Sequence, residues 1–357
     1  MPTNRPASNG PSPLVTVVLP VFNGEKVVAD AIRSIQAQTF QDWELVVLDD
    51  GSTDASLEVC RACATGDSRI TVVCNEANSG LGEAMSRLVT MGSGKYIAVQ
   101  EQDDISVPER LELEVEVLES KPRVALVSGI GAWLDDNLQI YSQFPGILAA
   151  GRQYPESSRE MVKYLYLEQC KVVNAACMFR RSVLTAGPAL FDGQARMSVD
   201  WQFFLRVAHH GQVFGIHKVL VRMRRGLGHQ HLSGNKGLQF AEARRCIKIV
   251  YRDYRQCAGS PIRYWLYRRA MSSQLTLEGR YYGTFKGFRR LCHALSYDPA
   301  NRRAWTSMIE LSMRGLRKTW KSISSPGSRC GDLELPATRS APMRPSPPGL
   351  DAEAYRQ

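Results

Sequence analysis

The first 120 residues alternate between short apolar runs and segments with helical periodicity, and this alternation restricts the fold more than any other feature of the chain. Four apolar runs rich in β-branched residues indicate buried strands, at residues 14–21, 44–48, 69–74 and 95–100. Segments with apolar residues at helical spacing follow them, at residues 25–38, 53–64, 80–91 and 108–119. Strands separated by helices pair in parallel and carry helices on both faces of the sheet. The sequence therefore predicts an α/β fold built on a Rossmann-like sheet.

The rest of the chain divides into a less regular middle, a helical region and two terminal segments. Further strands are expected at residues 124–128, 130–134 and 174–180, and a helix at residues 198–209. From about residue 237 helical faces recur without a strand pattern, whereas both ends are rich in Pro and Ser. We predict a disordered segment 1–13, an α/β domain 14–236, a basic C-terminal helical region 237–321 and a disordered tail 322–357.

Charge is distributed unevenly along a chain whose formal net charge is +10. Residues 1–205 carry a net charge of −9, residues 206–330 of +20 and residues 331–357 of −1. An acidic first part suits a metal site, and a basic second part suits an anionic partner. The basic helices have two interpretations: a solvated appendage packed on the α/β domain, or a surface that contacts anionic lipid.

The compartment follows from what the sequence contains and lacks. No stretch reaches the roughly 18 apolar residues that span a bilayer, and the N-terminus has no apolar signal-peptide core. The nine cysteines are scattered and odd in number, which favours reduced thiols. We therefore expect a cytoplasmic protein that is able to lie on the inner face of the plasma membrane.

Carboxylates gather where the fourth predicted strand ends, in the segment Glu101-Gln102-Asp103-Asp104. Like charges this close repel one another unless a cation or a hydrogen-bond network compensates them. Carboxylate and phosphate oxygens together are the ligands that Mg²⁺ takes. The alternative for an isolated acidic trio is a solvated turn.

A second polar loop, Asp49-Asp50-Gly51-Ser52-Thr53-Asp54, follows the second predicted strand. Asp50 could accept a hydrogen bond from a base or bind a ribose hydroxyl. The loop could equally be no more than a helix cap formed by Ser52 or Thr53. In parallel sheets ligands bind beyond the carboxyl ends of the strands, so both polar loops are expected at the ligand-binding edge.

Together these blocks resemble glycosyltransferase family 2, the inverting enzymes with the GT-A fold. The resemblance is carried by VTVVLPVFNGEKVVADAIRSIQAQTFQDWELVVLDDGSTDAS and by NEANSGLGEAMSRLVTMGSGKYIAVQEQDDISVPERLE. It is specific over residues 14–119 and continues more weakly to about residue 233, through MSVDWQFFLRVA.

The resemblance implies a role for each matching position. A nucleotide would be bound by Pro20, Phe22, Asn23, Asp50, Asn78, Gly80 and Gln102. A divalent cation, Mn²⁺ or Mg²⁺, would be held by Glu101, Asp103, Asp104 and His229. Asp200 would be the catalytic base, and the diphosphate would be bound by Arg222 and Arg224.

The chain departs from the family pattern at several of these positions. Glu101 stands where an Asp is usual, Ser86 where Asn is frequent, and Val199 where an acidic residue is common. Arg222-Met223-Arg224 replaces the usual Arg-x-His spacing of the late loop. These departures concern details of the pocket more than the class of protein.

The function implied is transfer of a sugar, with inversion, from a nucleotide sugar to a hydroxyl of a carbohydrate or lipid-linked acceptor. UDP is expected as the nucleotide only because it is common among members of this family. The competing function is a catalytically inactive, glycosyltransferase-like protein that binds a nucleotide or scaffolds a membrane complex. Nucleic-acid binding is not expected, because the basic half lacks a recognisable motif. A dinucleotide-dependent dehydrogenase is not expected either, because the first strand leads into VFNGEK and not into G-x-G-x-x-G.

Overall fold

The structure is a computed structural model that describes residues 12–323, apart from residues 136, 138, 149–150, 169–170, 186–190, 196–197, 225–234 and 258–260. Side chains are described as far as residue 314. The predicted terminal segments 1–13 and 322–357 lie, except for two residues each, outside the described part, and so does His229.

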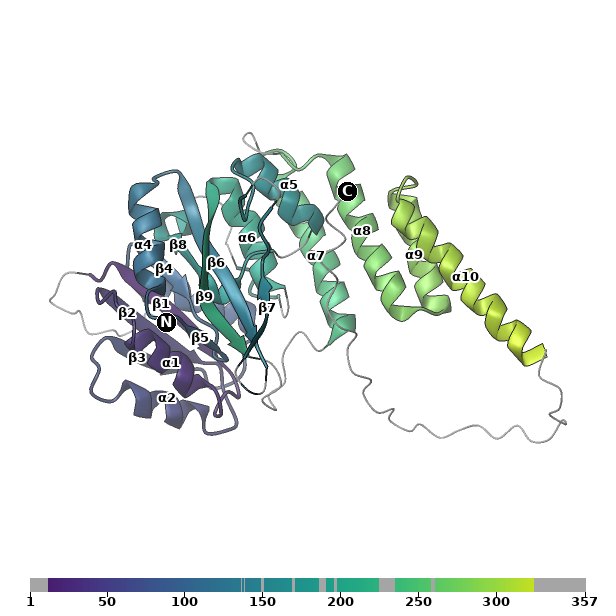
Figure 1. The fold of residues 1–357 in the computed structure, drawn as a ribbon. Coiled ribbons are helices and arrows are strands. Elements are labelled where there is room, and N and C mark those ends of the chain that lie inside the picture. Colours follow the sequence, from purple (N-terminus) through teal and green to yellow (C-terminus); the bar gives the residue numbers. More distant parts are fainter. Residues whose placement is uncertain are drawn as a thin grey trace, which may run out of the picture. The chain divides into compact units, whose positions relative to one another are not determined.

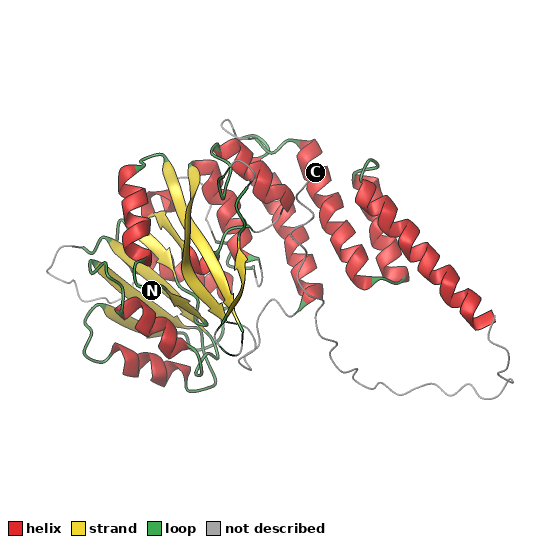
Figure 2. Ribbon diagram, viewed as in Figure 1, coloured by secondary structure: helices red, strands yellow, loops and turns green. Residues whose placement is uncertain are grey.

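Four parallel strands form the first half of the sheet (Figures 1 and 2), in the order β3–β2–β1–β4. They are β1 (Val15–Val21), β2 (Trp43–Asp49), β3 (Ile70–Cys74) and β4 (Tyr96–Val99), each within two residues of its predicted bounds. The central strands are buried on both faces because alternate side chains enter different cores: Val17 and Leu19 of β1 enter one, and Val18 enters the other. This explains why they are continuous apolar runs.

The second half of the sheet is mixed, so the predicted parallel pairing holds only for the first four strands. It contains β5 (Asp104–Ser106), β6 (Val124–Leu134), β8 (Cys177–Arg180) and β9 (Gln212–Arg224), and the full order is β3–β2–β1–β4–β8–β6–β9–β5. β8 runs antiparallel to both of its neighbours, and β5 runs antiparallel to β9. The runs 124–128 and 130–134 form a single strand, which also pairs with β7 (Ile140–Phe144).

Helices cover both faces of the sheet, as predicted (Figure 1). α1 (Val28–Gln36), α2 (Ser56–Ala64) and α4 (Arg110–Ser120) share a core with one face. α3 (Leu81–Met91), α5 (Ser158–Glu168) and α6 (Val199–His210) share a core with the other. Short 3₁₀ turns, η1 (Asn174–Ala176) and η2 (Arg181–Thr185), flank β8.

The C-terminal helical region consists of α7 (Lys236–Tyr254), α8 (Tyr264–Tyr282), α9 (Phe285–Tyr297) and α10 (Arg302–Ile323). α7 and α8 contribute Cys246, Ile247 and Leu266 to the same core as α5 and α6, so this core continues past residue 236. A smaller core joins α8, α9 and the start of α10. Chain contacts define one compact unit that ends at Leu311 and a second that begins at Ser312. Among the described residues no helix is long and apolar enough to cross a membrane.

Candidate active site

The candidate site lies at the carboxyl ends of β1, β2 and β4, where the chain register brings three loops together. Val21 at the end of β1 pairs with Asp49 at the end of β2, and the N–H of Gln100 after β4 donates to the carbonyl of Val18. The loop after β1 is therefore flanked by the loop that contains Asp50 and by the turn that begins at Glu101. This arrangement confirms that the predicted polar loops share one edge of the sheet.

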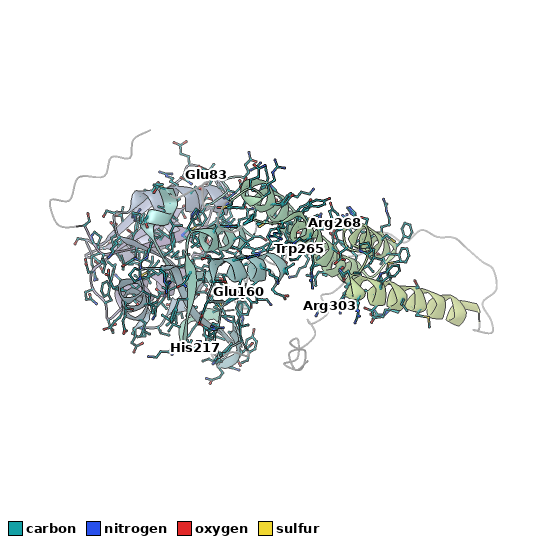
Figure 3. The ribbon with its side chains drawn as sticks, turned by 90° about the horizontal axis from the view of Figure 1, so that it is seen from above. Glu83, Glu160, His217, Trp265, Arg268 and Arg303 are labelled. Carbon is teal, nitrogen blue, oxygen red and sulfur yellow. The ribbon has the colours of Figure 1, made fainter. Side chains whose placement is uncertain are left out.

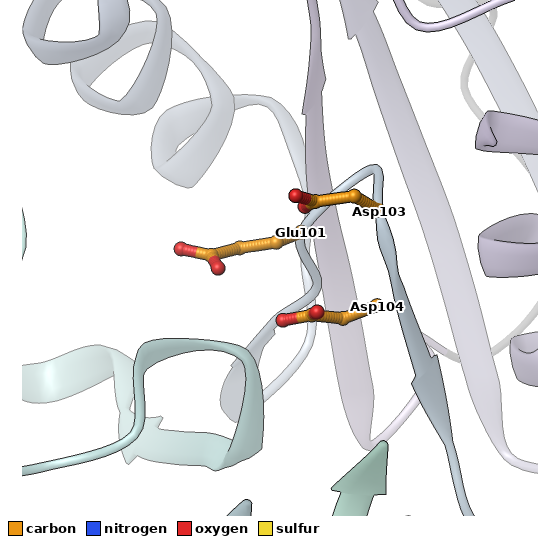
Figure 4. A group of neighbouring side chains, drawn as sticks. All are labelled: Glu101, Asp103 and Asp104. Atoms are coloured by element: carbon orange, nitrogen blue, oxygen red, sulfur yellow. The ribbon is translucent and has the colours of Figure 1, made fainter. Parts of the chain in front are cut away.

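The acidic cluster consists of Glu101, Asp103 and Asp104, whose side chains point to the same side of the turn (Figure 4). One carboxylate oxygen from each lies within 4.8 Å of the others. Asp104 is buried, and Glu101 and Asp103 are only partly exposed, so the cluster is not a solvated turn. Asn174 donates to Glu101 Oε1 at 2.8 Å.

Burial and electrostatic repulsion within this cluster favour protonation of its carboxylates. Burial, then Asp103 and Asp200, raise the pKa of Glu101 to about 7, although the hydrogen bond from Asn174 opposes the shift. Burial and the two neighbouring carboxylates also raise the pKa of Asp104 well above its ordinary value. Three carboxylates that repel one another at the end of a buried strand form an oxygen-only donor set. This set fits a hard divalent cation such as Mn²⁺ or Mg²⁺.

A buried polar network holds the turn that carries the cluster. The side-chain amide of Gln100 donates to the carbonyls of Glu101 and Asp104, at 3.0 and 2.7 Å. The guanidinium of Arg110 donates to Gln100 Oε1 at 3.1 Å and to Ser106 Oγ at 2.9 Å. Arg110 is fully buried and also forms an ion pair with the equally buried Glu114, at 3.2 Å.

Sequence analysis missed this network. The only sequence signal is the spacing of Arg110 and Glu114, four residues apart on a helix that is otherwise apolar on its buried side.

Asp50 is also buried, but the protein itself supplies its partners. Its Oδ1 accepts from the Asn75 amide, the Ser79 N–H and the Ser79 hydroxyl at 2.6, 2.9 and 2.7 Å, and its Oδ2 accepts from the Gly80 N–H at 2.9 Å. Burial acts to raise the pKa of Asp50, but these hydrogen bonds outweigh it and lower the pKa below its ordinary value. Gly80 has φ +87°, which favours glycine, and the neighbouring Asn78 is exposed.

The loop after β1 is fixed by the predicted nucleotide-binding residues themselves. Gln102 Oε1 accepts from the Phe22 N–H at 2.9 Å, and Gln102 Nε2 donates to the Phe22 carbonyl at 3.2 Å. Asn23 Oδ1 accepts from the Thr53 N–H at 2.9 Å. The ring of Phe22 remains 42% exposed, and Pro20 is partly exposed. The amide of Gln102 therefore binds the protein, whereas Phe22 is available to a planar ligand.

Asp200 lies in the first turn of α6 and is partly exposed. The helix is held by Trp201, whose indole N–H donates to the Leu165 carbonyl at 2.8 Å, and by Phe203, whose ring stacks on Phe191. Asp200 is close enough to Glu101 to raise the pKa of that carboxyl. The structure thus brings the predicted base and the acidic cluster together from elements a hundred residues apart in sequence.

The two predicted diphosphate ligands lie on β9, next to β5. Asp104 pairs with Met223, so Arg222 and Arg224 lie on the opposite face of this strand pair. The Arg224 N–H does donate to the Asp104 carboxylate, but its guanidinium forms an ion pair with Asp30 of α1 at 2.8 Å. Arg222 is exposed. The structure therefore does not direct either guanidinium at the acidic cluster.

Comparisons with known proteins agree with this geometry. Residues 16–186 match the family model described as Glycosyl transferase family 2. The match identifies a glycosyltransferase family 2 domain in this part of the chain. EpsE of Bacillus subtilis strain 168 is 35% identical over 150 residues, which are 40% of this chain and 54% of EpsE. The chain therefore spans about half the length of EpsE.

Two solved structures share its fold. One is Staphylococcus aureus TarS 1-349 in complex with UDP-GlcNAc, with a TM-score of 0.61 and 13% identity over 88% of this chain and 93% of that one. The other is the mannosyltransferase PcManGT of Pyrobaculum calidifontis in complex with GDP-Man and Mn²⁺. Its TM-score is 0.50, with 15% identity over 90% of this chain and 91% of that one. These similarities establish the GT-A-like fold.

Proposed function

We propose that this chain transfers a sugar, with inversion, from a nucleotide sugar to a hydroxyl of a carbohydrate or lipid-linked acceptor, as in the synthesis of a cell-envelope polysaccharide. The observation that carries the proposal is the convergence of Glu101, Asp103 and Asp104 at the end of β4, with Asp200 near enough to influence Glu101. A UDP-sugar is the proposed donor, and the TarS complex with UDP-GlcNAc supports it at the level of the fold.

In this proposal the two polar loops bind the donor nucleotide. The exposed ring of Phe22 lies against the base, beside Pro20, while Asn23 and Asp50 face the base and ribose. Among the described residues Asp50 Oδ2 accepts one hydrogen bond, from the Gly80 N–H, so it retains capacity for a second donor. Asn78 and Gly80 line the same loop, and Gln102 acts indirectly by fixing Phe22.

Asp200 is the proposed catalytic base. It takes the proton from the acceptor hydroxyl while that oxygen bonds to the anomeric carbon, and the bond from this carbon to the diphosphate breaks on the opposite face. Mn²⁺ or Mg²⁺ held by Glu101, Asp103 and Asp104 would neutralise charge on the departing nucleoside diphosphate. Arg222 and Arg224 are proposed to assist there, which for Arg224 requires release from Asp30. A contribution from His229 stays a prediction.

Asp200→Asn tests this assignment. Turnover should fall about 10²–10⁴-fold, because the amide cannot accept the proton, while donor affinity stays nearly unchanged. The matched control is Glu310→Gln, which removes an exposed carboxylate from α10. Near-normal turnover of Asp200→Asn would reject the assignment. If the wild-type chain neither transfers nor hydrolyses any nucleotide sugar, the alternative of an inactive nucleotide-binding or scaffold protein replaces the proposal.

A cytoplasmic location with peripheral contact to the inner face of the plasma membrane is part of the same proposal, because a lipid-linked acceptor would be presented there. The basic second part of the chain supports it.

A further inference from the structure

The start of α10 has apolar side chains on two faces, and only one of these faces packs against the protein core. Ala304 is buried against Leu275 of α8 and Leu291 of α9, and Met308 packs on the same small core. Asn301 fixes this orientation, because its amide donates to Ser272 Oγ on α8 at 2.8 Å. The opposite face of α10 is therefore turned away from α8 and α9.

That outer face carries large apolar side chains in a row. Trp305 and Ile309 lie four residues apart, and their exposed fractions are 49% and 61%. Residues four apart lie on the same side of a helix. Exposed aromatic side chains also occur on the adjoining helices, including Trp265 on α8 and Phe285 at the start of α9. A run of this kind on a monomeric surface marks a site of contact.

The charge around this row identifies the partner. Arg302 and Arg303 are exposed on α10 itself, and five further basic side chains are exposed before this helix: Arg263, Arg269, Arg280, Lys286 and Arg289. Glu310 is the only exposed acidic side chain among residues 263–311, since Glu278 is buried between Arg244 and Arg290. Figure 3 shows Trp265, Arg268 and Arg303 on these helices. An apolar row with basic flanks matches the interface of an anionic bilayer, with apolar side chains among the acyl chains and cations at the headgroups.

We propose that the outer face at the start of α10, defined by Trp305 and Ile309, inserts into the surface of an anionic lipid bilayer. The exposed cations at the start of the same helix, Arg302 and Arg303, bind the lipid headgroups. This inference depends on the proposed function in one respect: membrane binding would bring a lipid-linked acceptor to the enzyme. Bilayer binding itself requires neither a donor nor catalysis.

The test is sedimentation of the full chain with phosphatidylcholine vesicles prepared with or without phosphatidylglycerol. The wild-type chain should bind only vesicles that contain phosphatidylglycerol, and more weakly as salt is raised. Replacing Trp305 and Ile309 together by Ser should weaken binding about tenfold. The matched control replaces Ile140 and Tyr141 of β7 by Ser, because these side chains are equally exposed but lie outside the helices. This control should bind like wild type.

A charge variant gives independent evidence should the Ser variant fold poorly. Arg302→Gln with Arg303→Gln should lower both the affinity for phosphatidylglycerol vesicles and its dependence on salt. Equal binding of the wild type and the Trp305 and Ile309 variant would overturn the proposal, as would absence of wild-type binding. Light scattering supplies another test: a wild-type dimer that becomes monomeric in the Ser variant would make this face a contact between copies.

The vesicle result and the proposed function are separable by experiment. Sugar transfer to an acceptor in free solution should be the same for the wild type and the Trp305 and Ile309 variant. Failure of vesicle binding with intact transfer would reject only the membrane face. Absence of transfer with intact vesicle binding would reject only the enzymatic proposal.

Discussion

Two buried carboxylate sites lie at the same edge of the same sheet, yet the protein treats them in opposite ways. Asp50 accepts four hydrogen bonds from Asn75, Ser79 and Gly80, and its pKa is lowered. In the acidic cluster burial and the neighbouring carboxylates outweigh the hydrogen bond from Asn174, and the pKa of Glu101 is raised to about 7.

The difference shows which of the two sites requires a ligand to stabilise its ionised carboxylates. Asp50 is ionised without help, so it can organise the loop that contains Ser79 and Gly80 in the absence of any ligand. The acidic cluster reaches its fully ionised form only against repulsion, and a bound cation would remove that repulsion. The opposite pKa shifts thus distinguish Asp50, which organises its loop, from the cluster that we propose binds a cation.

Removal of one cluster carboxylate should have the largest effect. Asp103→Asn should lower transfer about a thousandfold, or about 4 kcal/mol in the barrier, because the cation loses a charged ligand. Mn²⁺ should raise the melting temperature of the wild type, and Asp103→Asn should abolish this rise. Without metal the variant should be at least as stable as wild type, since one source of repulsion is gone. Glu109→Gln, an exposed change in the same segment, is the control. A full Mn²⁺ response in Asp103→Asn would contradict the distinction between the two sites.

The opposite result is expected at Asp50, where a substitution should mainly lower the stability of the fold. Asp50→Asn should lower the free energy of unfolding by about 3 kcal/mol, because an amide cannot accept from all the donors that now bind the carboxylate. Urea unfolding would measure this, with the exposed Asp42→Asn as the control. The lowered pKa means that the ionised Asp50 stabilises the fold above pH 3.8, and this contribution is lost as the pH falls further. A loss of donor binding with unchanged stability would show that Asp50 is not an organising residue.

His209 provides a third case, a buried ring whose nitrogens have no hydrogen-bond partner among the residues that the structure describes. Its ring stacks on Tyr254 at 3.8 Å, both ring nitrogens lack a hydrogen bond, and burial, followed by His210, lowers its pKa to about 4. The unfolded chain takes up the proton near pH 6.5, so stability is complete above that pH and declines as the pH falls towards 4. The loss should be about 3 kcal/mol. His209→Phe, which keeps the stack, should remove this decline, whereas the exposed His217→Phe should not. An unchanged decline in His209→Phe would assign it to other groups.

The sequence was sufficient to predict the first half of the fold and the edge of the sheet at which the candidate site lies. β1, β2 and β4 are buried on both faces, so their apolar runs are unmistakable, and the polar residues after them must meet at one edge. β9 was not predicted: it contains the exposed His217 and Lys218, and its pairing with β6 shifts register, which breaks the alternation.

Contacts between distant segments could not be derived either. The ion pair of Arg224 with Asp30 joins β9 to α1, so an arginine expected at the diphosphate is held elsewhere. Arg110 has a fully buried guanidinium, which is rare for an arginine, and its spacing from Glu114 does not by itself predict burial.

The smallest expected effect concerns Gln102, the neutral residue within the acidic turn. Its amide exchanges two hydrogen bonds with the backbone of Phe22, and a side chain at Gly24 would clash with it, so it fits tightly against the loop after β1. Gln102→Leu should lower the free energy of unfolding by about 1 kcal/mol. Because Phe22 would then be less well positioned, the KM for the donor should rise while kcat changes little. Steady-state kinetics with a saturating acceptor would separate the two. A fall in kcat without a change in KM would place Gln102 with the acidic cluster instead of the nucleotide loop.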